Sequence, residues 1–224
     1  EWDLSSRCLN DKDLHFVISR AQSSEMAAGV RVLNLEANQI GAQGVRLLAD
    51  ALPQMASLES LNLFNNKIAD DGIGPLAEAA KLNRTLTALN LDGSELPVTR
   101  LNGAEPVDSL DLKDKGLGVK SAVVVAACIG VNSVLTEINL RGNSLGTEGW
   151  CAIFNALRDN KENKIAKWDL SRQKLDAEVA KSIAEYVAVS SVLTELNLRW
   201  NHLGDGEAAL REIAKDRPSL TLKL

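Results

Sequence analysis

The side chains that could carry acid–base or nucleophilic chemistry are few and far apart. The chain of 224 residues has two histidines, His15 and His202, near opposite ends, and three cysteines, Cys8, Cys128 and Cys151. A Ser-His-Asp or Cys-His arrangement needs its members within hydrogen-bond reach, and this separation gives no such geometry. The sequence also contains no glycine-rich loop that could cradle a phosphate. We therefore predict no catalytic residues and no enzymatic activity.

The same residues predict neither a metal site nor a cofactor. The three cysteines are odd in number and lack the paired spacing of a disulfide framework or a zinc site, which favours a reducing, cytoplasmic setting. Asp3, Asp111 and Asp169 stand at the same position of a sequence pattern that recurs along the chain. The copies of this pattern between them carry a neutral residue at that position. No two of these aspartates are close enough to share a metal or a proton.

Charge and hydropathy exclude two classes of partner. The formal net charge of −5 and the absence of a basic tract oppose binding to nucleic acid, where phosphate contacts dominate affinity. A membrane-spanning helix needs roughly 18 to 20 apolar residues, and the most apolar run, residues 121–130, is far shorter. Aromatic residues make up only 4% of the chain, so aliphatic side chains must fill the core.

A hydrophobic frame, L-x-x-L-x-L-x-x-N-x-L, recurs along the whole chain. Its fourth position falls at Trp2, Leu33, Leu61, Leu89, Leu110, Ile138, Trp168 and Leu196. Most neighbouring copies are 28 residues apart, and the shortest interval is the 21 residues from Leu89 to Leu110. A period of this size indicates one supersecondary unit stacked many times, because a single unit cannot bury its apolar face alone.

Each unit predicts a short strand, a turn and a helix. The alternation of Leu33, Asn34 and Leu35 is typical of a strand that buries one face. Residues 45–52 then place apolar side chains at helical spacing and end at Pro53. The same order returns in three further stretches, residues 58–80, 135–157 and 193–213.

The segments LNLEANQIGAQG, LNLFNNKIADDG, INLRGNSLGTEG and LNLRWNHLGDG resemble leucine-rich repeats and are most similar to the helix-bearing, ribonuclease-inhibitor-like subfamily. The resemblance covers essentially the whole chain. It implies an α/β solenoid of about eight coils, a horseshoe or arc with parallel strands on the concave face and helices on the convex face. Residues 1–224 would form a single leucine-rich-repeat domain. The motif is specific for fold and nearly silent on activity.

Two series of polar residues follow the frame. The ninth position carries Asn38, Asn66, Asn143 and Asn201, which we expect to bind backbone groups where the strand turns toward the helix. Other residues, Arg7, Ser94, Lys115 and Gln173, stand there in the remaining copies and put the turn geometry of those coils in doubt. The fifth position is Asn or Asp throughout, and we expect those side chains to hydrogen-bond to one another along the sheet.

The repeat is irregular in the middle and at both ends. Residues 97–106 contain two prolines and a glycine, so we predict a short loop without a regular helix, leaving a notch between the flanking helices. That notch could bind a partner, with Arg100 as a candidate contact, or simply be tolerated. Strands at Trp2 and at residues 219–224 predict uncapped ends, so the chain is either a segment of a longer one or has its edge strands covered by neighbouring chains.

The position of each aromatic residue in the frame predicts whether its side chain is buried or exposed. Trp2, Trp150 and Trp168 occupy positions that are aliphatic in other copies, so we expect them in the core. Trp200 falls at the eighth position, past the strand, and should be exposed near the rim. Phe64, at the seventh position, should point to the concave face. Exposed aromatic residues are enriched at binding hot spots, although a single one needs no explanation.

Charged residues around the strands complete the predicted surface. Acidic or neutral residues prevail toward the N-terminal half and basic residues toward the C-terminal half, so an acidic patch on a partner would be steered to the C-terminal half. The alternative is an ordinary solvated face. The predicted partner-binding residues are Glu36, Phe64, Asp92, Lys113, Arg141, Arg172, Arg199 and Trp200.

We therefore predict a protein–protein interaction module or scaffold that binds a protein partner through its concave face and rim. One alternative is a permanent structural subunit of a large protein assembly. Another, with less support, is a GTPase-activating protein resembling that of the Ran cycle, which would need an exposed arginine such as Arg100 aimed at a nucleotide.

Overall fold

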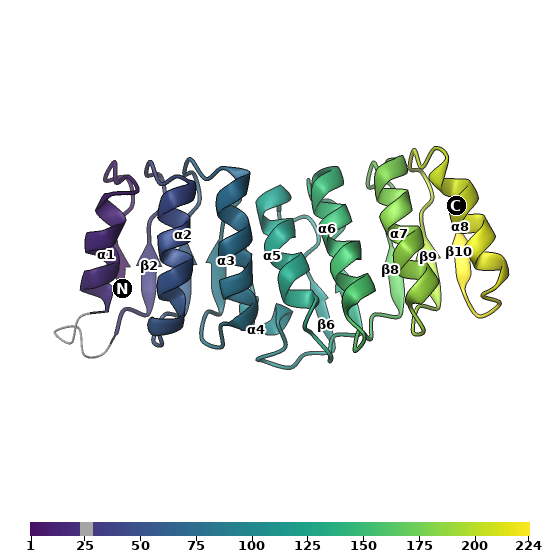
Figure 1. Ribbon diagram of the computed structural model, residues 1–224, viewed down its shortest axis with the longest axis horizontal. Helices are drawn as coiled ribbons and strands as arrows, with labels where there is room; N and C mark the ends of the chain where they lie inside the picture. Colours follow the sequence, from purple (N-terminus) through teal and green to yellow (C-terminus); the bar gives the residue numbers. More distant parts are fainter. Residues whose placement is uncertain (23–28) are drawn as a thin grey trace.

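The computed structural model describes residues 1–22 and 29–224 and has one layer of helices over one layer of strands (Figure 1). The strands are β1 (Trp2–Asp3), β2 (Val32–Asn34), β3 (Ser60–Asn62), β4 (Ala88–Asn90), β5 (Glu95–Leu96), β6 (Ser109–Asp111), β7 (Glu137–Asn139), β8 (Lys167–Asp169), β9 (Glu195–Asn197) and β10 (Thr221–Lys223). The helices are α1 (Asp13–Ala21), α2 (Ala42–Ala51), α3 (Asp70–Leu82), α4 (Val98–Leu101), α5 (Val119–Ile129), α6 (Gly146–Asp159), α7 (Ala177–Val189) and α8 (Gly206–Lys215), with a 3-10 turn η2 (Leu52–Gln54). Strands and helices alternate, as predicted for an α/β chain of repeats.

Parallel strands pair in the register of the frame. The fourth-position pairs are Trp2 with Leu33, Leu33 with Leu61, Leu61 with Leu89, Leu110 with Ile138, and Trp168 with Leu196. A slip of one residue would turn every side chain to the opposite face, so this register sends the whole series into the space between the layers. Trp150 and Trp168 are buried as predicted, whereas Trp2, on the strand at the edge of the sheet, is only half-buried.

The ninth-position asparagines join each coil to the one before it, where a coil is a strand with the turn and helix that follow. The Asn143 amide donates to the carbonyls of Leu112 and Leu140 at 2.8 Å, while its oxygen accepts from the backbone N–H groups of Lys115 and Leu117. Asn38 and Asn201 make the same four contacts in their coils, and Asn66 makes three of them. The predicted structural role is confirmed.

The turn after the strand keeps one conformation even where this asparagine is missing. The eighth-position residue has a left-handed φ between 54° and 98° in every coil: Ser6, Ala37, Asn65, Gly93, Asp114, Gly142, Arg172 and Trp200. The coils with Arg7, Ser94, Lys115 or Gln173 in place of asparagine therefore keep the usual conformation at the eighth position of the turn.

The fifth-position Asn and Asp side chains act mostly within their own coil, so the predicted hydrogen-bonded ladder is largely wrong. Seven of them accept from the backbone N–H two residues later, and Asn90 accepts from Gly93 three residues later. Because each strand ends after two or three residues, that N–H is the nearest donor. A contact between coils does occur where Asn197 donates to Asp169 at 3.0 Å.

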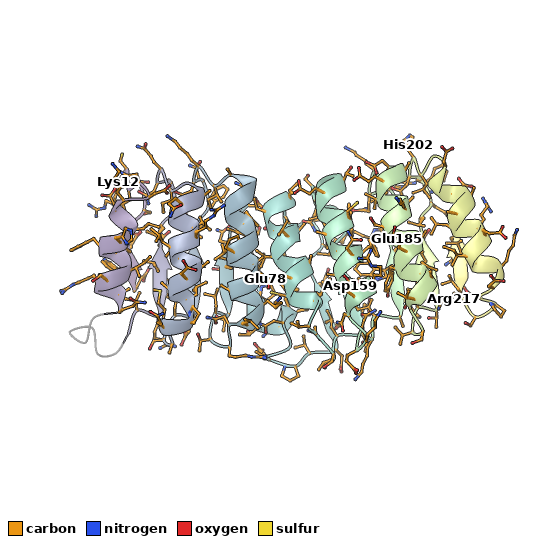
Figure 2. The ribbon with its side chains drawn as sticks, viewed as in Figure 1. Lys12, Glu78, Asp159, Glu185, His202 and Arg217 are labelled. Carbon is orange, nitrogen blue, oxygen red and sulfur yellow. The ribbon has the colours of Figure 1, made fainter. Side chains whose placement is uncertain are left out.

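A second asparagine series, which the sequence analysis overlooked, lies at the other edge, after the helices. Asn102, Asn132 and Asn160 each donate to two carbonyls of the preceding coil, such as those of Ile129 and Asn132 for Asn160. In the last coil Arg217 replaces asparagine and donates to Val187 and Leu193 (Figure 2). Both edges of these coils are thus joined by side chains that satisfy buried backbone groups.

Residues 97–106 differ from the prediction. Pro97 lies just before a single helical turn, α4, where a missing N–H costs nothing, and Val98 and Leu101 of this turn are fully buried. β5 folds back antiparallel on β4, and α3 packs directly against α5 (Figure 1). The predicted notch is therefore wrong, because the neighbouring helices close over the short coil.

Candidate partner-binding surface

The strand layer is interrupted between β7 and β8, at what we call the open boundary. At the boundary before it, between β6 and β7, Leu112 and Asp114 donate their backbone N–H groups to Asn139 and Arg141. The equivalent donors at the open boundary are Leu140 and Gly142; within residues 1–22 and 29–224, Leu140 N–H has no acceptor and Gly142 N–H turns to the Gln173 side chain. The two coils are thus held less closely here.

Four aromatic rings fill the core at the open boundary. Phe154 of α6 contacts Trp150, Trp168 and Tyr186, with ring centroids 6.2, 5.3 and 5.7 Å apart. These are half of the eight aromatic residues in the chain, concentrated between two coils. In the preceding coil, alanines stand 28 residues before Trp150 and Phe154, at Ala122 and Ala126. We attribute the missing backbone hydrogen bonds between β7 and β8 to this difference in side-chain volume.

On the strand face, the open boundary forms a hollow of about 400 Å³. Arg141 and Asp169 bridge it with an ion pair of 2.7 Å, and Lys223 pairs with Glu195 beside it. Burial alone raises the pKa of Asp169, but hydrogen bonds from Ser171 and the charge of Arg141 outweigh it and lower this pKa. The Lys223 ammonium lowers the pKa of Glu195. Both carboxylates are therefore held ionised and partnered.

At the edge where strands pass to helices, which we call the turn edge, Trp200 and Arg172 form a pair. Trp200 is 73% exposed, and the Arg172 guanidinium carbon lies 5.6 Å from the centroid of its ring. Arg199, next to Trp200, is exposed and has no ion-pair partner in the described part of the chain. His202 is exposed at the same edge (Figure 2). The predicted exposure of Trp200 is confirmed.

On the strand face, the N-terminal half offers a smaller aromatic surface. Phe64 is 36% exposed and its ring lies over Gly93, where an added Cβ would be 3.4 Å from it. Glu36 accepts a hydrogen bond of 2.9 Å from Asn62. Asp92 was predicted to contact a partner, but its carboxylate accepts hydrogen bonds from the backbone N–H groups of Gly118 and Ser121 at the start of α5. Asp92 is thus engaged by the fold.

The structure brings together only part of the predicted set. Arg172, Arg199 and Trp200 lie on adjoining coils at the turn edge, and Arg141 lies on the coil before them. Lys113 stands one coil earlier, 3.6 Å from Asp114, and the residues of the N-terminal half are separate. The role of all these residues in partner binding stays a prediction. Lys174, at a left-handed φ of 58° beside Arg172, was missed; its only sequence signal is its place after Gln173.

Candidate nucleophiles and metal ligands are placed apart. Burial raises the pKa of Cys128 to about 12, and all three cysteines are free. Among the described residues, no three His, Cys, Asp or Glu side chains are grouped so that they could hold a metal ion. Within the same ranges, none of the helices has both the length and the hydropathy to cross a membrane.

Comparison with known proteins gives three similarities. Residues 30–49, 54–77, 131–153 and 189–206 match the family described as Leucine Rich repeat. RAN GTPase-activating protein 2 of Arabidopsis thaliana is 28% identical over 118 residues, which are 52% of this chain and 22% of that protein. The chain therefore spans about a fifth of its relative. The tropomodulin C-terminal domain of Caenorhabditis elegans has 14% identity and a TM-score of 0.39 over 78% of this chain and 91% of that one, too low a score to support an argument.

Proposed function

We propose that this chain, whose leucine-rich repeats resemble those of the ribonuclease-inhibitor-like subfamily, is a single-domain protein–protein interaction module. It binds a protein partner through the strand face and the turn edge of its C-terminal half. Trp200 is the observation that carries this proposal. The strand face is the concave face of the arc that the resemblance implies, and the free cysteines favour a cytoplasmic setting.

Trp200 is costly for a structural residue. It shares the left-handed φ of the other eighth-position residues, at a cost of roughly 1–2 kcal/mol, and unlike them it exposes a large apolar ring to solvent. Arg172 lies over the ring and limits its freedom, so less conformational entropy is lost when a partner covers it.

The surrounding charges favour an acidic partner. Arg199 is next to Trp200, Arg172 lies over its ring, and Lys174 lies beside Arg172, while Arg141 is already neutralised by Asp169. Opposite charge on a partner would mainly raise the association rate and fix the orientation of the complex.

The test is a quantitative pull-down from a native extract with the triple variant Phe64→Ala, Arg199→Ala, Trp200→Ala. Its matched control, Phe16→Ala, Leu82→Ala, Arg211→Ala, removes three exposed side chains from the helices. We expect proteins that bind the wild type and the control to be lost from the triple variant. Equal recovery on all three would contradict the proposal.

A permanent subunit of a large assembly is the alternative that uses the same surfaces. β1 and β10 lie at the outer edges of their sheets, so neighbouring chains could extend either sheet by pairing with them. Light scattering of the isolated chain separates the two cases. A stable monomer favours the interaction module, and concentration-dependent association through the ends favours the subunit.

GTPase activation is a second candidate because of the similarity to RAN GTPase-activating protein 2. Arg100, the loop arginine nominated for it, donates to Glu105 of the same loop at 2.9 Å, which would have to be released for an arginine to reach a nucleotide in trans. We expect no catalytic activity. Stimulated GTP hydrolysis by Ran that is lost in Arg100→Ala would overturn this expectation.

A further inference from the structure

We call a boundary closed where the strands of its two successive coils are paired. At the two closed boundaries beside the open boundary, an asparagine side chain fills the space between the turns. Between the coils of β6 and β7, the Asn143 side-chain oxygen accepts from Lys115 N–H at 3.1 Å and Leu117 N–H at 3.0 Å. Between the coils of β8 and β9, Asn201 binds Gln173 N–H and Leu175 N–H in the same way, at 3.0 Å each. One side-chain oxygen thus satisfies two backbone donors of the preceding coil.

At the open boundary this oxygen is missing. Gln173 stands where asparagine is expected, and its longer side chain accepts from Gly142 N–H at 3.2 Å and donates to Ser171 O at 3.0 Å. The donors equivalent to Lys115 and Leu117 are the backbone N–H groups of Asn143 and Leu145. Neither has a hydrogen-bond partner in residues 1–22 and 29–224. Ser94 and Lys115 also replace asparagine, but they adjoin the β4–β5 hairpin, where the chain takes another path.

A hollow of about 500 Å³, which we call the turn hollow, lies at these two donors. Asn143 and Leu145 line one side, and Arg172, Gln173 and Lys174 line the other. Its lining has two cationic side chains and no carboxylate. Backbone donors and cations around one concavity are the arrangement that binds anionic oxygens.

Asp114 and Asp176 are acidic groups beside the turn hollow. The Asp114 carboxylate lies against Gly142 and 3.6 Å from the Lys113 ammonium. Asp176 accepts from Thr147 Oγ1 and from the backbone N–H groups of Glu178 and Val179 at the start of α7. These hydrogen bonds, led by that of Thr147, lower the pKa of Asp176. The Asp176 carboxylate is therefore bound to the first turn of α7. The cations Arg172 and Lys174 have no ion-pair partner within the described ranges.

We propose that the turn hollow binds a carboxylate side chain from an acidic segment of a protein partner. One carboxylate oxygen takes the place that the asparagine oxygen fills at the closed boundaries and accepts from Asn143 N–H and Leu145 N–H. Arg172 and Lys174 pair with the rest of the acidic segment. The inference rests on the proposed function, because it names the chemistry of the partner that binds beside Trp200.

The test follows backbone amides by NMR while a hexa-aspartate peptide is added to the full chain. We expect the Asn143 and Leu145 amide protons to move downfield and to saturate together. Inorganic phosphate is the second probe, and we expect it to move them at least about tenfold less at equal concentration, because it lacks the neighbouring carboxylates that reach both cations. Unmoved amides, or an equal response to phosphate, would overturn the proposal.

Two variants separate binding from folding. Gln173→Asn restores the asparagine, so Asn143 N–H and Leu145 N–H should be bound internally, the peptide response should vanish and the Tm should rise by about 3 °C. Arg172→Asn with Lys174→Asn removes both charges but keeps a residue that tolerates positive φ, and should weaken peptide binding at least about tenfold. Lys164→Asn, which removes an exposed cation outside the turn hollow, is the control and should bind normally. A peptide response that persists in Gln173→Asn would also overturn the proposal.

Failure of this inference differs from failure of the proposed function. If the triple variant loses its partner while the Asn143 and Leu145 amides ignore the peptide, the surface binds a partner without this carboxylate contact. If the amides respond but the triple variant retains all partners, the carboxylate site stands and the surface proposed around Trp200 does not.

Discussion

Two successive boundaries between coils differ in how their backbones are joined, although the coils have the same fold. One lies between the coils of β6 and β7, and the other between those of β7 and β8. At the first, backbone hydrogen bonds continue from the strands into the turn and Asn143 occupies the space between turns. At the second, the strands are unpaired, Gln173 stands in for asparagine and aromatic rings replace alanines.

This difference shows how a repeat can acquire a site without changing its fold. Closing a boundary needs a side-chain oxygen of the right reach and core side chains of the usual volume. At the open boundary both the side-chain oxygen and the core side chains differ. The same pair of coils then has two hollows, the turn hollow with its polar donors and the hollow on the strand face. Trp200 lies on the coil that follows, so the open boundary and the strained aromatic residue form one surface.

The largest expected effect concerns the rings that separate the coils. Phe154→Ala removes the ring that contacts the other three, and we expect it to lower the free energy of unfolding by about 3–5 kcal/mol. Val125→Ala, fully buried in the aliphatic coil before it, should cost about 1–2 kcal/mol. Urea denaturation measures both. If Phe154→Ala cost no more than Val125→Ala, the aromatic cluster would not be what distinguishes the open boundary.

The second prediction compares the two ninth-position residues directly. Asn143→Ala leaves two backbone donors and two carbonyls without partners, so we expect a loss of about 2–4 kcal/mol. Gln173→Ala removes two weaker contacts at a boundary that is already open and should cost below about 1 kcal/mol. Equal losses in urea denaturation would show that Gln173 closes its boundary as well as Asn143 does.

The third prediction exchanges the eighth-position residues of the coils of β9 and β3. Trp200→Asn relieves left-handed strain and loses the Arg172 contact, so stability should rise by about 0.5 kcal/mol while partner binding falls. Asn65→Trp introduces the same strain without an arginine to contact the ring and should cost about 1 kcal/mol. Thermal denaturation of both variants checks the signs. A marked loss of stability in Trp200→Asn would make Trp200 a structural residue.

The smallest expected effect depends on pH. The pKa of Asp169 is below its ordinary value of 3.8, so its stabilising contribution is present above about pH 4 and is lost as the pH falls through the lowered pKa. Asp169→Asn should therefore cost about 0.5 kcal/mol at pH 7, a small value because the pair is part-exposed, and progressively less as the pH falls below 3.8. Asp216→Asn, which forms no ion pair in the described ranges, is the control. A cost that persists at low pH would show that Asp169 acts by packing rather than by charge.

Much of the fold could be predicted from the sequence, because the frame places Leu33, Leu61 and Leu89 at positions that only stacked coils can bury together. The ninth-position asparagines were predicted for the same reason. The fifth-position side chains were mispredicted, because a repeated position does not reveal whether its nearest donor lies in the same coil or the next. The short coil closed over because α4 needs a single turn to bury Val98 and Leu101.

Part of the candidate site was predicted from the sequence, but the reason for its place was not. Register identified Trp200 and Arg172 as exposed, and Gln173 as a departure. The unpaired donors of Asn143 and Leu145 could not be predicted without knowing where the Gln173 side chain reaches. The aromatic core at this boundary could not be predicted either, because its four rings come from two different coils.

The most direct test is hydrogen exchange of individual backbone amides in the wild-type chain without any partner. Lys115, Leu117, Gln173 and Leu175, which donate to asparagine oxygens, should be protected. Asn143 and Leu145, at the same positions of the open boundary, should exchange at least about 100-fold faster. Equal protection of these two amides would contradict the account, because the turn hollow would then have no free donors to offer.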